Sequence, residues 1–268
     1  MTPPSYDPAG GARLAWGPAG AVALAGGPAP VAAVVVDVLS FTTTVGVAAD
    51  RGVAVLPWRW RDPAGAASYA DEHAAHLAVG RSESRRDGGP SLSPVSVRDA
   101  PVDLRRLVLP SPNGATVALA LAEAGATVVA GSLRNATAVA DHVADLVAEG
   151  GHDLLLVAAG ERWAADDSLR PAVEDLWGAG AVLEAVLRVL PDLPCSPGAR
   201  AAAAAWRDVR PRSGADLAGA LLATDSGREL AGAGWTDDVR LAAEHDSSTS
   251  VPVLQGTSFV PATGMRAL

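Results

Sequence analysis

The sequence predicts an α/β fold with mainly parallel strands and a helical C-terminal part. Short, continuous apolar runs rich in β-branched residues recur along the chain, as in strands that are buried on both faces of a parallel sheet. Segments with helical periodicity separate these runs, which is the order of repeated βαβ units. The composition supports a sizeable core, because 49% of the 268 residues are hydrophobic and only 19% are charged.

Residues 1–30 are expected to form an irregular N-terminal entry, because Pro and Gly are dense there. At most one short strand is predicted within them, near Ala21–Ala25. Regular structure is predicted to begin with Val31–Val36, a β-branched run that is followed directly by Asp37.

Further strands and helices continue the alternation. Strands are predicted at Val53–Leu56, Leu107–Leu109, Thr127–Ala130 and Leu154–Ala158. The segments Ala136–Ala148 and Leu176–Leu190 place their apolar residues on one helical face. Residues 80–103 are rich in Arg, Gly and Pro, and we expect a long loop there that is a candidate active-site flap.

The chain after Pro194 is predicted to be mostly helical. Helices are expected through Trp206, over Asp216–Ala223 and over Thr236–Glu244, the last one capped by Thr236. A short strand at Val251–Leu254 is expected to end the fold. Residues 31–268 then form either a single domain or two intimately packed lobes, 31–190 and 191–268.

The charge pattern points to a small acidic ligand. The net charge is −9, and all 21 basic residues are Arg. Without Lys there is no Schiff base and no Walker-type phosphate lysine, whereas guanidinium groups remain available for phosphate or sulfonate. An acidic surface also argues against a nucleic-acid partner. An Ala-rich helical tail offers a surface for a homo-oligomer.

Other features of the sequence favour a cytoplasmic location. Cys195 is alone, so neither an intramolecular disulfide nor a Cys-rich metal site is expected. The sequence shows no signal-peptide pattern and no membrane-span pattern, so no membrane partner is expected.

The first candidate site follows the Val31–Val36 strand. Asp37 leaves the strand, and the hydroxyls of Ser40, Thr42 and Thr43 open the next helix. Because ligands of α/β sheets collect at the carboxyl ends of strands, Asp37 is placed to ligate Mg²⁺ and the hydroxyls to hold phosphate oxygens. The alternative is that Ser40 or Thr42 only caps the helix.

Two further turns join a strand to a helix. In the first, Asn113-Gly114 favours positive backbone torsions, and Asn113 or Thr116 is placed to point at a ligand; an ordinary turn with a helix cap is the alternative. The second turn, at 131–135, offers Arg134 and Asn135.

A third candidate site follows the Leu154–Ala158 strand. Glu161 and Arg162 come after Gly160, and the pair Glu174-Asp175 begins the next predicted helix. The pair is either complementary to the helix dipole or part of a metal or acid/base site. The chain lacks the G-x-S-x-G and G-x-G-x-x-G motifs, and its five His show no ligand spacing.

These segments, in this order, resemble the 2-phosphosulfolactate phosphatase (ComB-like) family from about Val31 to Pro261. That family carries D-V-L-R-A-S-T-T, T-T-N-G-T, G-S-x-x-N-A, C-A-G and E-D-x-x-x-A-G. The corresponding stretches here are D-V-L-S-F-T-T-T at 37–44, S-P-N-G-A-T at 111–116, G-S-L-R-N-A at 131–136, A-A-G at 158–160 and E-D-L-W-G-A-G at 174–180. Five ordered matches are more specific than any one of them.

The resemblance implies an α/β/α sandwich and hydrolysis of (2R)-phosphosulfolactate to sulfolactate and phosphate with Mg²⁺, a step of coenzyme M biosynthesis. It places Asp37, Glu174 and Asp175 as catalytic and metal-binding residues. A larger set is expected to bind the substrate or its phosphate, with nearby Arg side chains neutralising a second acidic group. This set is Ser40, Thr42, Thr43, Asn113, Gly114, Thr116, Arg134, Asn135, Glu161, Arg162 and Arg81.

The chain departs from the family at several positions, which makes it a divergent member, and two of these positions bear on anion binding. Ser40 stands where the family has Arg, and Leu92 stands where it has Asn. Losing a charged hydrogen bond to a buried anion changes substrate preference. The alternatives are therefore a phosphatase of another small acidic ester, with Arg81 or another Arg compensating, and a non-catalytic protein that binds an anion or a protein partner.

Overall fold

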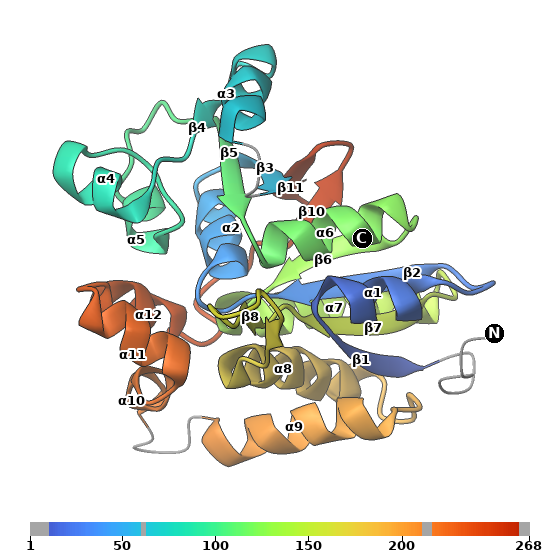
Figure 1. The fold of residues 1–268 in the computed structure, drawn as a ribbon. Coiled ribbons are helices and arrows are strands. Elements are labelled where there is room, and N and C mark those ends of the chain that lie inside the picture. The colour runs from blue at the N-terminus through green and yellow to red at the C-terminus, as the bar shows by residue number, and fades with distance from the viewer. Residues whose placement is uncertain (1–10, 60–62, 211–215, 263–268) are drawn as a thin grey trace.

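The computed structural model describes residues 11–59, 63–210 and 216–262, and in them it shows a sheet with helices on both faces (Figure 1). The order of the nine strands in this described part is β1 (Ala12–Trp16), β7 (Asp153–Ala158), β2 (Val31–Val36), β6 (Thr127–Gly131), β10 (Pro252–Gln255), β11 (Ser258–Pro261), β3 (Ala54–Arg59), β5 (Arg106–Ser111) and β4 (His76–Leu77). The predicted α/β class is confirmed.

The sheet consists of two parallel parts joined by an antiparallel hairpin. Strands β1, β7, β2 and β6 pair in parallel, and so do β3, β5 and β4. Hairpin β10–β11 lies between the two parts and pairs antiparallel with β6 on one side and with β3 on the other. The sheet is therefore completed by strands from the C-terminal end of the described chain.

Helices cover the two faces of the sheet, as expected for an α/β/α sandwich. Helices α1 (Gly17–Ala25), α2 (Phe41–Asp50) and α6 (Gly114–Glu123) pack on one face, and α7 (Ala136–Ala148), α8 (Val173–Val189) and α9 (Pro197–Val209) pack on the other. Strand β2 shows why, because Val34 and Val36 point into the α7–α8 core while Ala33 and Val35 point into the α2–α6 core.

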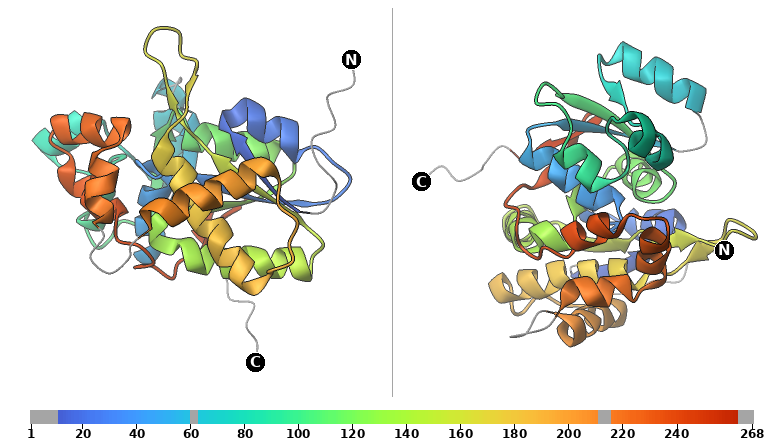
Figure 2. Two further views of the ribbon diagram at one scale, coloured as in Figure 1. Left: turned by 90° about the horizontal axis from the view of Figure 1, so that it is seen from below. Right: turned by 90° about the vertical axis from the view of Figure 1, so that its left-hand side faces the viewer.

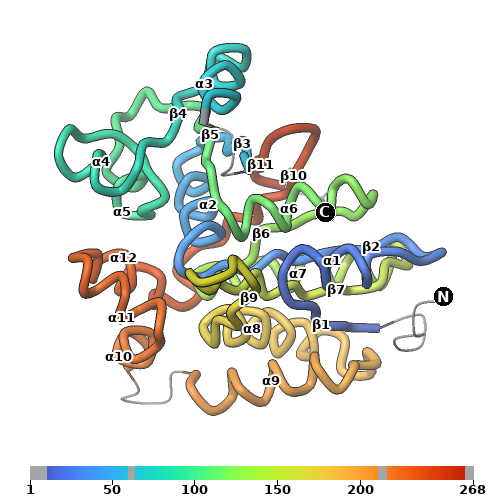
Figure 3. Tube along the Cα trace, viewed as in Figure 1, coloured from blue at the N-terminus to red at the C-terminus, as the bar shows by residue number. Residues whose placement is uncertain are grey.

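Smaller elements surround one end of the sandwich. They are α3 (Pro63–Glu72), α4 (Arg81–Asp87), α5 (Pro94–Arg98), η1 (Leu133–Asn135), hairpin β8 (Glu161–Arg162)–β9 (Leu169–Arg170), α10 (Leu217–Leu222), α11 (Asp225–Gly232) and α12 (Thr236–Ala242). The trace in Figure 3 places α4 and α5 on the same side of the molecule as α11 and α12, and α5 packs against α12. Hairpin β8–β9 projects from the body (Figure 2).

Two sequence-based expectations about local structure are wrong. Ala21–Ala25, expected as a strand in an irregular entry, belongs to α1, which follows strand β1. Residues 80–103, expected as a loop, contain α4 and α5; Pro94 begins α5, and Ser93 caps it by accepting a hydrogen bond from Ser96 N. The residues before 11, also part of the expected entry, lie outside the described ranges.

The C-terminal predictions hold in outline and fail in detail. The three helices are present as α9, α10 and α12, but α12 begins at Thr236 itself and has no side-chain cap. The predicted strand at Val251–Leu254 is β10, and its partner β11 was not expected. None of the helices in the described ranges has the length and apolar character that a membrane crossing requires.

Candidate functional site

The candidate site lies where β2, β5 and β7 end. Strands β2 and β7 are neighbours, but β5 belongs to the other parallel part of the sheet. Helix α6, which follows β5, crosses the face of the sheet and packs on β2 and β6 as well as on β5. Its first residue, Gly114, therefore reaches Asp37 after β2, and the two polar turns predicted from the sequence meet.

Asp37 is buried and fixed by backbone amides. Its Oδ1 accepts a hydrogen bond from Phe41 N at 3.0 Å, and its Oδ2 accepts one from Gly114 N at 2.9 Å. Burial raises the pKa of Asp37 to about 6, although the two amides and Arg81 oppose the shift. The side chain thus stays at the strand end as a carboxylate that is costly to ionise.

Gly114 is required by close approach. Neither Asn113 nor Gly114 has a positive φ, so the expected positive torsions are wrong. A Cβ at position 114 would lie 2.4 Å from Phe41 Cδ1 and 2.7 Å from Asp37 Oδ2. The absent side chain is what allows the amide of Gly114 to reach the carboxylate.

Asp175 ties the ends of β2 and β7 together. It lies in the first turn of α8, and its two carboxylate oxygens accept hydrogen bonds from Val38 N at 2.8 Å and from Gly160 N at 2.9 Å. Burial, followed by the charges of Asp37 and Glu174, raises its pKa well above the ordinary value. Asp175 therefore serves the backbone of two strand ends.

Glu174 precedes Asp175 and is also buried, with 2% of its surface exposed. Within the part of the chain that the structure describes, its carboxylate accepts no hydrogen bond, and its charge contributes to the raised pKa of Asp37. Of the acids at this site, Glu174 is the one that lacks a protein partner for its oxygens.

Glu161, on strand β8, completes the group. Its Oε2 accepts a hydrogen bond from Asn113 Nδ2 at 2.8 Å. Burial raises the pKa of Glu161 to about 7, and the charge of Asp37 adds to the shift. We call Asp37, Glu161, Glu174 and Asp175 the acidic cluster.

The acidic cluster opens on a small cavity. The cavity volume is about 260 Å³, which suits a small metabolite rather than a polymer. It is lined by Asp37, Leu39, Ser40, Arg81, Leu92, Ser111, Pro112, Asn113 and Glu161. Four of the residues singled out from the sequence after strand ends therefore share one cavity wall: Asp37, Ser40, Asn113 and Glu161.

Arg81 brings the positive charge to this cavity. It begins α4, and its Nη2 donates to Ser40 Oγ at 2.8 Å and to Leu92 O at 3.3 Å. Its Nε lies 3.6 Å from Asp238 Oδ2, on α12. Burial lowers the pKa of Arg81, whereas Asp238, Asp37 and Glu161 raise it, so the group remains a cation at neutral pH.

The hydroxyls of Thr42 and Thr43 face the backbone. Thr42 Oγ1 accepts from Asp37 N and donates to Asp37 O, both at 2.9 Å, and Thr43 Oγ1 donates to Val38 O at 2.7 Å. The side chain of Ser40 makes no capping bond, nor does that of Asn113. These threonines shape the turn after β2, while Ser40 and Asn113 are left to line the cavity.

Four other predicted residues lie outside the cavity lining. Arg134 forms ion pairs with Asp50 and Glu244, and Asn135 Nδ2 donates to Ser250 O at 3.0 Å. Arg162 is paired within its own hairpin, where its Nη1 donates to Asp167 O at 2.9 Å. Thr116 Oγ1 lies 3.4 Å from Ser111 O. The structure brings none of these four side chains to the acidic cluster.

Asp238 is the residue near the site that the sequence analysis missed. Its side chain is 1% exposed and accepts a hydrogen bond from Ser93 Oγ at 2.5 Å. The sequence contains a pattern that could have identified it. Asp238 lies three residues before Leu241 and four before Ala242, both buried, and so falls on the apolar face of its helix. An acid on such a face needs a partner.

The acidic cluster has the chemistry of a Mg²⁺ site. Among the described residues, no three His, Cys, Asp or Glu side chains are arranged as a ready protein cage for a metal. Mg²⁺ does not need one, since it binds one or two carboxylates and completes its shell with water and phosphate. The carboxylate of Glu174, without hydrogen bonds and beside Asp37, fits such a cation.

Comparisons with known proteins agree with the motifs. A family model described as 2-phosphosulpholactate phosphatase matches residues 24–257. A Deinococcus radiodurans protein described as "probable 2-phosphosulfolactate phosphatase" is 32% identical over 241 residues, covering 89% of this chain and 94% of that protein.

Proteins of Thermus thermophilus and Prochlorococcus marinus carry the same description. The first is 31% identical over 230 residues, covering 85% of this chain and 89% of that protein. The second is 32% identical over 230 residues, covering 84% and 89%. The family model thus covers every residue that lines the cavity.

Proposed function

The chain belongs to the 2-phosphosulfolactate phosphatase family, and from this membership and its site we propose that it is a Mg²⁺-dependent phosphatase of a small acidic phosphate ester, with phosphosulfolactate the first candidate. The products are the free alcohol, sulfolactate, and inorganic phosphate. We place this activity in the cytoplasm, in agreement with the single Cys of the sequence.

One observation carries the proposal. Two members of the acidic cluster, Asp37 and Glu161, and the guanidinium of Arg81 line the same 260 Å³ cavity at the ends of β2 and β7. Carboxylates that hold a cation and a guanidinium that holds an oxyanion are the groups that phosphate transfer requires. The family match covers every one of these residues.

Asp37, with Glu174 or Asp175, is proposed to hold Mg²⁺. Asp37 lines the cavity, and the carboxylate of Glu174 accepts no hydrogen bond from the described residues. Asp175 holds the backbone after β2 and after β7 in place. When bound, the cation neutralises phosphate oxygens and makes phosphorus more susceptible to attack. The amides that hold Asp37 keep this carboxylate from turning away.

Glu161 is proposed to move a proton during the reaction. The net reaction breaks the bond between phosphorus and the ester oxygen and forms a bond between phosphorus and a water oxygen. The leaving alkoxide needs a proton. Glu161 lines the cavity, Asn113 holds its Oε2, and its Oε1 has no hydrogen-bond partner among the described residues. A proton on Oε1 is therefore available for the leaving oxygen, and a pKa of about 7 suits this transfer at neutral pH.

The test is phosphate release from a panel of esters that includes phosphosulfolactate and phospholactate, with Mg²⁺ and with chelator. We expect release by the wild type with Mg²⁺ and no release with chelator. The best ester identifies the substrate. Glu123→Gln, which removes an exposed carboxylate paired with Arg59, is a control that should match the wild type.

Absence of release from every ester, in protein shown by calorimetry to bind Mg²⁺, would contradict the proposal. It would favour the non-catalytic anion-binding alternative. Release that persists undiminished in chelator would contradict the metal requirement while leaving the phosphatase activity in place.

A further inference from the structure

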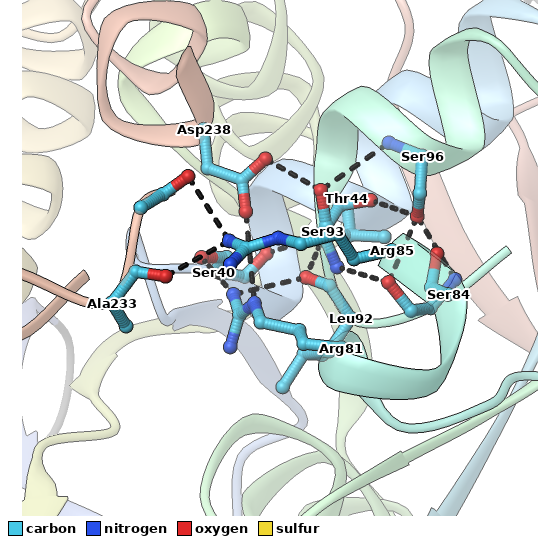
Figure 4. A network of polar contacts seen from close by, with 12 residues as sticks. Ser40, Thr44, Arg81, Ser84, Arg85, Leu92, Ser93, Ser96, Ala233 and Asp238 are labelled. Carbon is cyan, nitrogen blue, oxygen red and sulfur yellow. Dashed lines mark hydrogen bonds and ion pairs between the residues drawn. The ribbon is translucent and has the colours of Figure 1, made fainter. Parts of the chain in front are cut away.

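The ion pair between Arg81 and Asp238 joins three segments that are distant in the chain. Arg81 belongs to α4, Asp238 to α12, and Ser93, which donates to Asp238 Oδ1, precedes α5 (Figure 4). The family match gives no role to this pair. Because Arg81 lines the same cavity as Asp37 and Glu161, the geometry of the pair bears on how a ligand is held.

One nitrogen of the Arg81 guanidinium remains available as a hydrogen-bond donor. Of the described residues that line the cavity, it is the only cation, and two of the others, Asp37 and Glu161, are acids. Its Nη2 is used by Ser40 Oγ and Leu92 O, and its Nε faces Asp238. Its Nη1 makes no hydrogen bond to any described residue, so this nitrogen can donate to a ligand.

Asp238 contacts the guanidinium of Arg81 without lining the cavity itself. The distance of 3.6 Å between Nε and Oδ2 is an ion pair without a hydrogen bond, and both atoms are buried with no hydrogen-bond partner in the described ranges. Burying two charged groups without a hydrogen bond between them costs folding free energy, so such a pair calls for a functional explanation. Ser93 Oγ, at 2.5 Å from Oδ1, fixes the carboxylate in place.

We propose that Arg81 binds one of the acidic groups that the substrate carries besides its phosphate, the sulfonate or the carboxylate, and that Asp238 is the positioning residue that aims Arg81 into the cavity. The proposal rests on the proposed function and adds the recognition of the part of the ester that is not phosphate. The C-terminal helices thereby contribute to specificity without lining the cavity.

The acidic cluster explains why one guanidinium would be assigned this task. Asp37 and Glu161 repel a bare anion, and a bound cation can compensate them on the phosphate side. A second anionic group in the same 260 Å³ has only Arg81 as a partner among the lining residues. Arg81 therefore decides between esters that carry this second group and esters that lack it.

The first experiment measures kcat and KM with Mg²⁺ for phosphosulfolactate, phospholactate and isopropyl phosphate. For Arg81→Gln we expect KM for phosphosulfolactate to rise roughly 10- to 100-fold, as for loss of a hydrogen bond to a charged group. Isopropyl phosphate, which has no second acid, should change less than about threefold. An equal loss on phosphosulfolactate and isopropyl phosphate would overturn the proposal.

The two acid-bearing esters identify the group that Arg81 binds. A loss on phosphosulfolactate alone assigns the guanidinium to the sulfonate, and a similar loss on phospholactate assigns it to the carboxylate. Both results support an oxyanion contact at Arg81 Nη1.

The positioning role is tested with a double-mutant cycle. Asp238→Asn should raise KM for phosphosulfolactate about 10-fold with kcat nearly unchanged, and Arg81→Gln combined with Asp238→Asn should be no worse than Arg81→Gln alone. Additive losses would overturn the role of Asp238. The double variant also removes the lone buried charge that Arg81→Gln leaves, so it keeps the test interpretable if the single variant unfolds.

Arg85→Gln is the matched control. Arg85 also links α4 to the C-terminal helices, through Ala233 O at 2.8 Å and the face of Trp235, but it does not line the cavity (Figure 4). It should leave all three KM values within about threefold of wild type. A KM increase equal to that of Arg81→Gln would mean that docking of α4, and not the guanidinium of Arg81, sets the affinity.

Direct binding separates this inference from the phosphatase proposal. Calorimetric titration of sulfolactate into chelator-treated protein needs no turnover. We expect binding by the wild type and by Arg85→Gln, and affinity at least about 10-fold weaker in the double variant. Equal affinity in the double variant, or no binding by the wild type, would overturn the role of Arg81 even if phosphate is released.

Discussion

The two sides of the cavity are built differently. On the acidic side, Asp37 and Asp175 each accept two backbone hydrogen bonds, all from strand ends or helix starts. On the side of Arg81, the guanidinium is held by a serine, one carbonyl oxygen and an acid on another helix. The first arrangement is part of the sheet itself, whereas the second depends on how peripheral helices pack.

This difference suggests that the two sides of the cavity have different functions. The acidic side is rigid because moving a carboxylate there would leave amides without partners. The Arg81 side can differ between related chains without disturbing the sheet, because two side chains and one loop carbonyl hold it. We therefore expect substitutions on the acidic side to affect catalysis and folding, and substitutions on the other side to affect substrate choice.

The largest effect should come from Asp37→Asn. It keeps an acceptor for one amide and removes the charge proposed to face Mg²⁺, so kcat/KM should fall on the order of 10²-fold or more. Phosphate release with the best ester of the panel measures it. Activity within threefold of the wild type would show that Asp37 only supports the turn.

Asp175→Ala should have the largest effect on stability. It leaves the buried amides of Val38 and Gly160 without acceptors, at about 1–3 kcal/mol each. Asp175→Asn, with one acceptor retained, should cost about half as much. Urea denaturation gives both values, and equal stability of the wild type and the alanine variant would mean that the strand ends do not depend on this acid.

Gly114→Ala should be next. The added Cβ meets Phe41 and Asp37 at distances that require one of them to move, and such overpacking costs about 1–3 kcal/mol. Gly46→Ala is the control, because nothing lies within 4 Å of a Cβ there, in the interior of α2. It should stabilise the fold by up to about 1 kcal/mol. If both variants behave alike in denaturation, the tight approach at Gly114 is not a constraint.

A smaller effect concerns pH in the presence of chelator. The pKa values of Asp37 and Glu161 are raised to about 6 and about 7, so the native state holds more protons than the unfolded chain between about pH 4 and pH 7. Stability should therefore fall as pH rises through this window, by at most about 1.4 kcal/mol per pH unit for each proton, and Asp175, whose pKa is also raised, adds to the fall. Other carboxylates oppose the trend at its acidic end.

Glu161→Gln is the control for this titration. It should flatten the upper part of the dependence, near pH 7, and leave the part near pH 6 that belongs to Asp37. Denaturation midpoints at half-unit pH intervals measure both curves. Identical curves for variant and wild type would separate Glu161 from the effect.

The smallest effect should come from Arg85→Gln. The side chain is exposed and contributes one cation–π contact, at 4.1 Å from the ring of Trp235, and hydrogen bonds to Ala233 O and Gly234 O. Its loss should lower stability by about 1 kcal/mol or less. A loss as large as that of Asp175→Ala would mean that the two sides of the cavity do not differ in this way.

The acidic side was largely predictable from the sequence. Asp37, Asn113 and Glu161 all follow β-branched or apolar strands, and strand ends of a parallel sheet meet at one edge. Glu174-Asp175 at a helix start was equally visible. The sequence does not show that the hydroxyls of Thr42 and Thr43 donate hydrogen bonds to backbone carbonyls, because those bonds depend on the path of the turn after β2.

The other side was not predictable in the same way. Arg81 was one of several candidate guanidinium groups, and nothing local distinguishes it from Arg134 or Arg162, which the structure pairs elsewhere. Its partner Asp238 is bound to Ser93, 145 residues away in the chain. Contacts of this range come from tertiary packing, and neither periodicity nor turn chemistry reports them.

The elements of the fold also divide into those that local sequence patterns predict and those that they do not. Strands β2, β6 and β7 were located from apolar runs, whereas α4 and α5 were hidden in a segment rich in Arg, Gly and Pro. Helix α1 was misjudged because Ala and Gly dominate it, and its packing on α6 supplies what propensity does not.

The position of hairpin β10–β11 has a consequence for synthesis on the ribosome. Until residues 252–261 have emerged, β6 and β3 each have an unpaired edge, and the two parallel parts of the sheet have no strand between them. Unpaired edges in a growing chain invite association with other chains. We therefore expect the nascent protein to close its sheet only after residues 252–261 have emerged, which makes it a candidate client for chaperones that shield exposed strand edges.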